Sequence, residues 1–393
     1  MTETMQATTG TTTRDIVLVS NSVDEIGGIT SWSHQMARLF SERGHQVHVV
    51  GIVPAPEERR ADLGTDLPYR TTTLYDVHPP VLKPRRGVKG RLDLVERRRR
   101  ASRASGMRRE AAKLTGILRS VRPGSVVVVT QVWAMEWVAL ADTSGLRVIG
   151  MSHESFQTCR ASSRFQRVKR YYQDVDRMLA LTREDADLWI RQRFDHVGAM
   201  PNPLPFFPDE PSPRTAKAVV SIARLHEEKG VDLLLDAWSE VAPRHPDWVL
   251  RVHGSGEEEQ ALKAQSARLG LTDSVEWMGR TDDVPGALRG GSLFALSSRG
   301  EGFPLALMEA MATGVPCVAF DVAPGVREII ADGENGLVVP PGNTGEFARR
   351  LDELISDKEL RDRMGERARV DIQRYSTDEI VARWESLFAL LDR

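Results

Sequence analysis

The sequence is poor in cysteine, in aromatic residues and in long apolar runs. Its 393 residues include two cysteines, Cys159 and Cys317, and 6% aromatic residues. Two isolated cysteines provide neither a disulfide framework nor a set of metal ligands. No apolar run approaches the roughly 18 residues of a membrane-spanning helix, and residues 1–13 lack the basic start and apolar stretch of a secretory signal. We therefore expect a globular protein with a frayed polar tail, located in the cytoplasm.

The net charge of −2 conceals an uneven distribution. Residues 1–200 contain 31 Lys and Arg against 22 Asp and Glu, whereas residues 201–393 contain 22 against 33. Much of the positive excess lies in residues 83–113, which hold 13 basic and 3 acidic residues, including the run Arg97 to Arg100. This segment is either a solvated loop and helix face or a surface that meets anionic lipid or a phosphate-bearing molecule. Nucleic acid is disfavoured as a partner because no aromatic residue interleaves the charges.

Short apolar runs alternate with segments of helical spacing along the whole chain, which predicts an α/β protein with parallel sheets. In the first half, strands are expected at 16–20, 46–51, 126–130, 147–151 and 178–181, with helices at 29–42 and 183–194. In the second half, strands are expected at 218–223, 248–253, 274–278, 293–297 and 315–320, and helices at 231–241, 257–268, 304–313 and 378–391.

A proline-rich segment, residues 201–213, separates the two halves. The pattern predicts two Rossmann-like domains, residues 1–200 and 214–377, that face each other across a cleft. Ligands of such sheets bind beyond the carboxyl ends of the strands. Functional residues are therefore sought directly after each predicted strand.

Two basic residues, Arg224 and Lys229, lie between the strand at 218–223 and the helix that follows. Cations beside the free N–H groups of a helix N-terminus suit a pyrophosphate, although both could also be ordinary surface charges.

A second motif, EGFPLALMEAMATGVP at residues 301–316, predicts an almost wholly apolar helix that contains Glu309. Such a helix is buried, and a buried carboxylate needs hydrogen-bond partners. No basic residue lies one turn away, so the partner is either a ligand hydroxyl or a distant arginine. Glu301, Gly302 and Phe303 precede the helix, where free N–H groups could hold a sugar or an anionic oxygen.

The motif EGFPLALMEAMATGVP downstream of RLHEEKG resembles the retaining glycosyltransferases of family 4, which have the GT-B fold. The resemblance is strong over residues 219–342 and looser before them. It implies that Glu301 contacts the donor sugar, that Glu309 holds the ribose, and that Arg224 and Lys229 neutralise the diphosphate. It also implies that the backbone N–H groups of Gly302 and Phe303 face the sugar, and that the C-terminal residues 378–393 pack back on the first domain.

Weaker correspondences come from the glycines and from the first half. Gly27 and Gly28 match the family's early glycine-rich loop, and the alternative is that they only permit a tight turn. His153, just after a predicted strand, resembles a cleft histidine of the family or is simply structural. Asn202 is expected to be a hinge residue, and the loop that begins at Gly254 is expected to line the nucleotide cleft.

Other motifs point away from cofactors. The Gly254 loop lacks the third glycine of a dinucleotide fingerprint and carries three glutamates, so no NAD site is expected. Asp174 with Asp176, and Asp185 with Asp187, resemble metal-binding acid pairs. Both pairs lie in stretches predicted as helical, where residues i and i+2 point apart. Neither a metal nor another cofactor is implied.

The resemblance implies transfer of a hexose or N-acetylhexosamine from a nucleotide-sugar, most often UDP-linked, with retention of anomeric configuration. The acceptor expected from the basic segment is a phosphate-bearing or lipid-linked molecule, such as a cell-envelope glycan precursor, reached by peripheral contact with the membrane. Two alternatives remain: a nucleotide-sugar epimerase or hydrolase on the same scaffold, and a non-catalytic protein that binds nucleotide-sugar.

Overall fold

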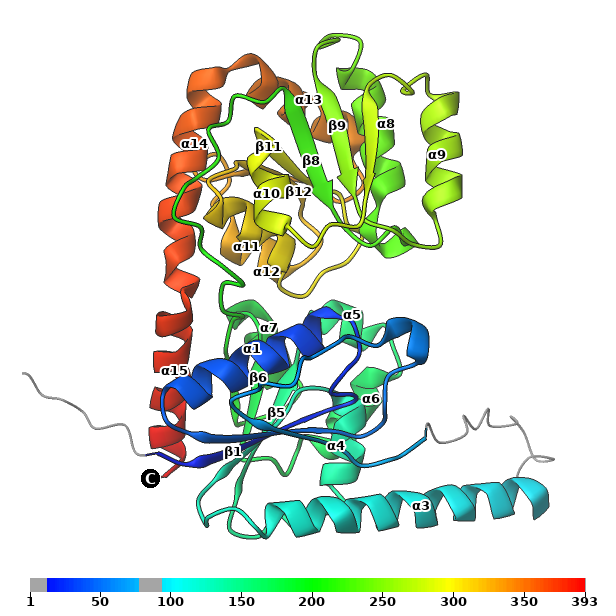
Figure 1. Ribbon diagram of the computed structural model, residues 1–393, viewed down its shortest axis with the longest axis vertical. Coiled ribbons are helices and arrows are strands. Elements are labelled where there is room, and N and C mark those ends of the chain that lie inside the picture. The colour runs from blue at the N-terminus through cyan, green and yellow to red at the C-terminus, as the bar shows by residue number, and fades with distance from the viewer. Residues whose placement is uncertain (1–12, 78–93, 393) are drawn as a thin grey trace, which may run out of the picture.

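The computed structural model describes residues 13–77 and 94–392, which form two α/β domains stacked along the long axis of the molecule (Figure 1). Each domain is built on one parallel sheet with helices on both faces. Strands buried on both faces need continuous apolar runs, which Val126–Val129 and Leu293–Leu296 supply. The two-domain α/β architecture predicted from the alternating pattern is confirmed.

The N-terminal domain holds a seven-stranded sheet. In spatial order its strands are β3 (Arg70–Thr73), β2 (Gln46–Gly51), β1 (Asp15–Ser20), β4 (Val126–Val129), β5 (Arg147–Ser152), β6 (Arg177–Ala180) and β7 (Val197–Ala199). Its helices are α1 (Gly28–Glu42), the 3-10 turn η1 (Glu57–Arg59), α3 (Leu94–Leu118), α4 (Val132–Val138), α5 (Phe156–Arg160), α6 (Arg164–Tyr171) and α7 (Arg183–Ile190).

The C-terminal domain holds a six-stranded sheet. In spatial order its strands are β10 (Val275–Gly279), β9 (Val249–His253), β8 (Ala218–Ile222), β11 (Leu293–Leu296), β12 (Cys317–Phe320) and β13 (Leu337–Val339). Its helical segments are η2 (Glu227–Lys229), α8 (Val231–Val241), α9 (Glu259–Arg268), α10 (Val284–Arg289), α11 (Leu305–Ala312), α12 (Pro324–Ile329), α13 (Thr344–Ser356), α14 (Lys358–Asp371) and η3 (Ile372–Tyr375).

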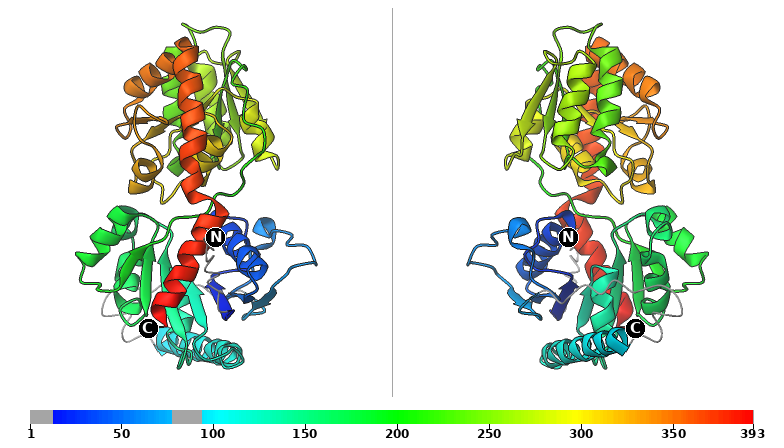
Figure 2. Two further views of the ribbon diagram at one scale, coloured as in Figure 1. Left: turned by 90° about the vertical axis from the view of Figure 1, so that its left-hand side faces the viewer. Right: turned by 90° about the vertical axis from the view of Figure 1, so that its right-hand side faces the viewer.

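The last helix, α15 (Thr377–Leu391), returns to the N-terminal domain, where it packs on α1 (Figure 2). The rings of Trp384 and Phe388 lie 5.9 and 5.7 Å from that of Phe40, and Trp32 lies 6.2 Å from Trp384. Ion pairs at both ends of the helix, such as Arg14 with Asp392 at 3.0 Å, add polar contacts. One apolar core therefore continues from the C-terminal domain into the N-terminal domain.

The structure differs from the sequence prediction at one of the acid pairs. Asp174 and Asp176 lie in a turn and not in a helix. The Asp176 carboxylate accepts a hydrogen bond from the Val148 backbone N–H at 2.7 Å and pairs with Arg147 at 3.3 Å. The prediction of helical structure at this pair was therefore wrong, and Asp176 is held by the start of β5. Asp185 and Asp187 do lie in α7.

The described part of the basic segment lies on the edge of the N-terminal domain that faces away from the C-terminal domain (Figures 1 and 2). This part belongs to α3, on which Arg98, Arg108 and Arg109 are exposed. Residues 83–93 lie outside the described residues, as does the tail at residues 1–12. A molecule bound to α3 would therefore be remote from the interdomain cleft. No helix of the described chain is both long and apolar enough to cross a membrane.

Candidate functional site

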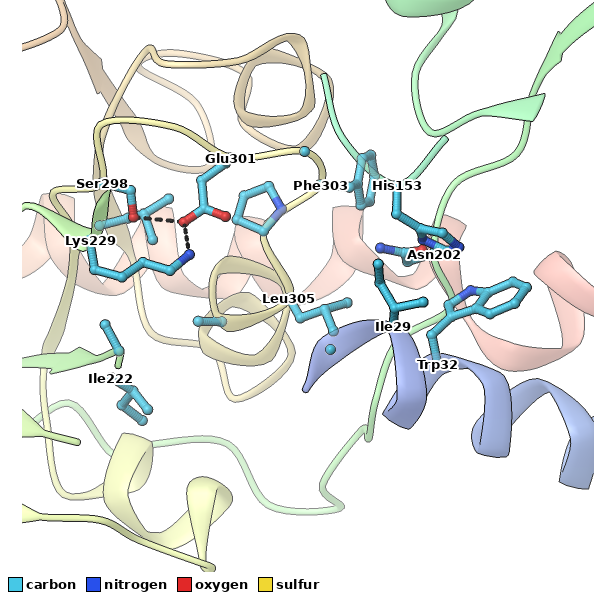
Figure 3. A pocket seen from close by; sticks show the side chains of 16 residues that line it. Ile29, Trp32, His153, Asn202, Ile222, Lys229, Ser298, Glu301, Phe303 and Leu305 are labelled. Atoms are coloured by element: carbon cyan, nitrogen blue, oxygen red, sulfur yellow. Dashed lines mark hydrogen bonds and ion pairs between the residues drawn. The ribbon is translucent and has the colours of Figure 1, made fainter. Parts of the chain in front are cut away.

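A cavity of about 310 Å³ lies between the domains, at the carboxyl ends of β8 and β11 (Figure 3). The C-terminal domain lines it with residues such as Lys229, Ser298 and Glu301. The N-terminal domain contributes Trp32 and His153 from the opposite side. Because carboxyl ends of parallel strands leave loops and helix N-termini free, this is the position where such folds bind ligands.

Lys229, Ser298 and Glu301 form a polar cluster on the C-terminal wall. The Lys229 Nζ lies 2.7 Å from Oε1 of Glu301, and the Ser298 hydroxyl donates a hydrogen bond of 2.6 Å to the same oxygen. Lys229 ends η2 after β8, whereas Ser298 and Glu301 belong to the loop after β11, which is the neighbouring strand. Sheet pairing therefore brings together a cation and a carboxylate separated by 72 residues.

Glu309 lies on α11, one turn after Leu305, and is not itself among the residues that line the cavity. It shares a helix face with Leu305, which lines the cavity, because residues i and i+4 are neighbours on a helix. Its side chain is half-buried, and its carboxylate has no hydrogen-bond or ion-pair partner among the described residues. Burial raises the pKa of Glu309 to about 7. Burying a carboxylate without hydrogen bonds costs free energy, and hydrogen bonds from ligand hydroxyl groups would lower that cost.

The backbone before α11 offers further donors. Gly302 and Phe303 line the cavity, and neither N–H donates a hydrogen bond to an acceptor in the described chain. Gly302 also packs against the other domain: a Cβ at this position would lie 2.3 Å from the His153 carbonyl oxygen. Only glycine fits at position 302, because the two domains touch there, and the N–H of Gly302 stays available to a ligand.

Arg224 is placed differently from Lys229. It follows Ala223, which lines the cavity, but its own side chain is exposed and makes no ion pair with a described residue. The structure thus gathers Lys229 and Glu301 and leaves Arg224 at the rim.

On the N-terminal wall, His153 follows β5 and lies edge-on against Trp32, with 4.9 Å between ring centroids. Burial lowers the pKa of His153 to about 4, so its imidazole is neutral near pH 7. Its Nε2 is buried without a hydrogen-bond partner in the described part of the protein. A neutral imidazole can donate one hydrogen bond and accept another, so it suits contact with a sugar hydroxyl.

The glycines expected at the site fall into two groups. Gly27 and Gly28 have no left-handed backbone, and a Cβ at either would meet nothing within 4 Å. A tight turn therefore does not explain them, and the space before them is open to a ligand; Gly28 lines the cavity. Gly254, in contrast, has φ +141°, and a Cβ there would lie 1.8 Å from the Ala223 carbonyl oxygen. Gly254 therefore packs the loop after β9 onto the loop after β8, outside the cavity lining.

Three polar or aromatic lining residues were not predicted as ligand contacts from the sequence: Trp32, Ser298 and Asn202. Trp32 could have been found from its position four residues after Gly28 on one helix face, and Ser298 from its place directly after a strand. Asn202, expected to be a hinge residue, is buried in the cavity wall beside His153, and its Oδ1 has no partner in the described chain.

The two sheets, the crossing helix α15 and the cleft between the domains define the GT-B fold. Residues 205–371 match the family described as Glycosyl transferases group 1. The matched segment covers the C-terminal domain but less than half of the chain, so the likeness to this family is one of that domain.

Individual relatives show a similar likeness. The chain is 34% identical to an uncharacterized glycosyltransferase of Haemophilus influenzae over 215 residues, which are 54% of this chain and 61% of the relative. It is 37% identical over 222 residues to the exopolysaccharide phosphotransferase SCO2592 of Streptomyces coelicolor, covering 55% of this chain and 24% of the relative. The matches thus span less than two thirds of either relative.

Among solved structures, a mutant of S. aureus TarM in complex with fondaparinux, alpha-GlcNAc-glycerol and UDP superposes with a TM-score of 0.76. The match covers 95% of this chain and 99% of TarM at 15% identity. At this identity the likeness shows the fold alone.

Proposed function

We propose that the protein is a glycosyltransferase that moves a sugar from a nucleotide-sugar, a UDP-hexose or UDP-N-acetylhexosamine, to an acceptor. The observation that carries the proposal is the pairing of Lys229 with Glu301 inside an interdomain cavity. A sugar diphosphate requires a cation for the phosphates and a hydroxyl-binding carboxylate for the sugar, a few ångströms apart. UDP in the TarM complex and the family match support the same assignment.

In the proposed reaction, the bond between the anomeric carbon and the diphosphate oxygen breaks while a bond to the acceptor oxygen forms. Lys229 neutralises the charge that develops on the leaving diphosphate, helped by Arg224 and by free N–H groups before α11. Glu301 holds the sugar hydroxyls, and Glu309 holds the ribose. Membership of family 4 and retention of configuration belong to this proposal: attack occurs on the face that the diphosphate leaves, and a diphosphate oxygen accepts the acceptor's proton.

The test is nucleotide release from a panel of UDP-, GDP- and ADP-sugars, with and without crude acceptor extracts. The variants are Lys229→Ala and Glu309→Ala, and the matched control is Lys217→Ala, whose side chain pairs with Asp247 on the surface. We expect the wild-type protein to release nucleotide from one donor. Lys229→Ala should lower this rate roughly 100-fold or more, whereas the control should release nucleotide at the wild-type rate. An equal loss of nucleotide release in all three variants, or no binding of any donor, would overturn the proposal.

Acceptor dependence separates the transferase from the alternatives. An epimerase or hydrolase on this scaffold would release nucleotide or convert donor at the same rate without an acceptor. A non-catalytic protein would bind donor without turnover.

We also propose that the exposed basic residues of α3 bring the N-terminal domain to an anionic membrane surface, at the cytoplasmic face. The support is the exposure of Arg98 and Arg108 on the edge that faces away from the cleft. Charge attraction of this kind contributes about 1 kcal/mol per residue. Charge reversal at both positions should weaken sedimentation with phosphatidylglycerol vesicles, and unchanged sedimentation would overturn the proposal.

A further inference from the structure

A second cavity, of about 190 Å³, lies within the N-terminal domain beside the first. It opens at the carboxyl ends of β1, β4 and β5, between α4 and α6. Its lining includes the polar and aromatic residues Asn21, Gln131, Trp133, Glu154, Arg164 and Arg167. None of these residues takes part in the donor site described above.

The two cavities share a wall. His153 and Ile29 line both of them, so a molecule in the second cavity would meet the sugar of a donor in the first. That position is required of an acceptor, because its hydroxyl must reach the anomeric carbon. The inference therefore rests on the proposed function and concerns the chemical class of its second substrate.

The charge of this cavity is contributed by α6. Arg164 and Arg167 are three residues apart and thus lie on one face of the helix. Residues 155–173 contain five Lys and Arg and no Asp or Glu. Each guanidinium presents five N–H donors in a planar fork that matches the oxygens of a phosphate or carboxylate.

Each arginine is held by one carboxylate that an anion could replace. Arg164 lies 3.1 Å from Glu154, and Arg167 lies 3.4 Å from Glu136. Both guanidinium groups remain substantially exposed, with 50% and 41% of their side chains open to solvent. Burial, together with Glu228 across the cleft, raises the pKa of Glu154 despite the nearby Arg164. The negative charge of Glu154 is thus disfavoured, which makes it a weak competitor for Arg164.

The opposite wall suits an uncharged, hydroxylated part of a ligand. Trp133 is half-buried and presents an aromatic surface, supported edge-on by Trp137 with 4.5 Å between ring centroids. Gln131 is fixed by a hydrogen bond of 2.9 Å from the Asn21 N–H to its Oε1, so its amide nitrogen stays free to donate. The Asn21 Oδ1 is buried without a partner in the described chain.

We propose that this second cavity is the acceptor site, and that it selects acceptors carrying a phosphate or carboxylate group, bound by Arg164 and Arg167, close to the hydroxyl that receives the sugar. The anion-binding residues are on α6 beside the cleft and not on α3, which lies at the far edge of the domain (Figure 1). Contact with a membrane through α3 and recognition of the acceptor through α6 are then separate functions of separate surfaces.

The experiment measures ligand binding to the full chain saturated with UDP, which occupies the donor site. The probes are matched pairs, glucose with glucose 6-phosphate and glycerol with glycerol 3-phosphate, followed by phosphatidylglycerol vesicles to separate a lipid headgroup from a free phosphate ester. The variants are Arg164→Gln and Arg167→Gln. Arg170→Gln is the control, because Arg170 is exposed on the same helix and does not line the cavity. Calorimetric binding of UDP to each variant verifies its fold.

We expect a phosphorylated probe to bind at least about tenfold more tightly than its neutral partner, and Arg164→Gln and Arg167→Gln each to abolish most of that difference. Arg170→Gln should retain it. Equal binding of charged and neutral probes, equal loss in Arg170→Gln, or no binding of any phosphorylated probe would overturn the inference. Failure of wild-type protein to bind UDP would instead overturn the donor site, and the same titrations on the UDP-free protein would still decide the second cavity.

Discussion

The Lys229 ammonium and the Glu301 carboxylate neutralise each other across 2.7 Å, in the position where a donor would need both groups. The side chain of Glu301 is 11% exposed and that of Lys229 is 27% exposed, so solvent screens the pair only in part. Binding of a sugar diphosphate must therefore divide the pair, with phosphate oxygens replacing Glu301 at Lys229 and sugar hydroxyls replacing Lys229 at Glu301. The two residues are expected to have opposite effects on nucleotide binding.

Glu301→Gln should accordingly bind UDP at least as tightly as wild type, because Lys229 is released from its competitor, while turnover of the UDP-sugar falls roughly 100-fold. Lys229→Ala should lose both UDP binding and turnover of the UDP-sugar. Calorimetry with UDP and a nucleotide-release assay measure the two quantities on the same preparations. Weaker UDP binding in Glu301→Gln would contradict the shared-site interpretation.

The raised pKa of Glu309 predicts a pH-dependent stability. In the unfolded chain this carboxyl titrates near its usual value of 4.5, whereas in the folded protein it titrates at about 7. Between these values the folded state binds more protons, so the free energy of unfolding falls as the pH rises. Glu309→Gln should therefore be more stable than wild type by about 1–3 kcal/mol at pH 8, with the difference vanishing below pH 4.5. Urea unfolding of both proteins at several pH values measures this difference in the free energy of unfolding.

The same carboxyl predicts how donor binding depends on pH. If Glu309 accepts ribose hydroxyls, wild-type affinity for UDP-glucose should rise with pH through about 7, and Glu309→Gln should show a flat profile. UDP-glucose is the suitable ligand because its diphosphate diester does not titrate in this range, and His153 is already neutral there. A parallel pH dependence in both proteins would assign the effect to another group.

Gly28 provides a test of the open space before α1. Because a Cβ there meets nothing and the backbone is not left-handed, Gly28→Ala should leave the melting temperature unchanged or slightly raised. Donor turnover should nevertheless fall, since the added methyl group intrudes on the ligand. Gly116→Ala is the matched control on α3, where a Cβ also meets nothing; it should stabilise by about 0.5–1 kcal/mol and keep full activity. Full activity in Gly28→Ala would show that this glycine does not contact the donor.

Charge neutralisation by the protein alone, which forms part of the proposed mechanism, predicts that activity is independent of divalent metal. EDTA treatment followed by assay in chelated buffer should change the rate by less than about twofold. Restoration of a lost activity by Mg²⁺ or Mn²⁺ would show that a metal ion assists the leaving diphosphate.

The crossing helix predicts a large stability effect far from the chemistry. Trp384 is fully buried between the domains' shared core residues, so Trp384→Ala should destabilise the protein by about 3–5 kcal/mol. Leu390→Ala, on the exposed side of α15, should cost well under 1 kcal/mol. Denaturant unfolding measures the stability of both variants. Similar losses of stability in the two would mean that docking of α15 is not a main source of stability.

Much of the fold was readable from local patterns. The helix at Val231–Val241 and the strand at Gln46–Gly51 lie where the sequence places them, because their apolar periods and terminal glycines act over a few residues. Elements without such signals were missed. The edge strand Arg70–Thr73 is short and polar, and α6 has one buried residue among many charges.

The sequence by itself determined the chemistry available to this protein: the loop with Arg224 and Lys229, and the loop and helix with Glu301 and Glu309. Only the tertiary structure decided which of these groups meet. Pairing of β8 with β11 joins Lys229 to Glu301, while Arg224 stays at the rim. It also decided that the arginines of the second cavity come from α6, whereas α3 lies on the side of the N-terminal domain that faces away from the C-terminal domain. Local periodicity specifies each element, whereas distances between elements depend on sheet order and domain packing, which no short window of sequence contains.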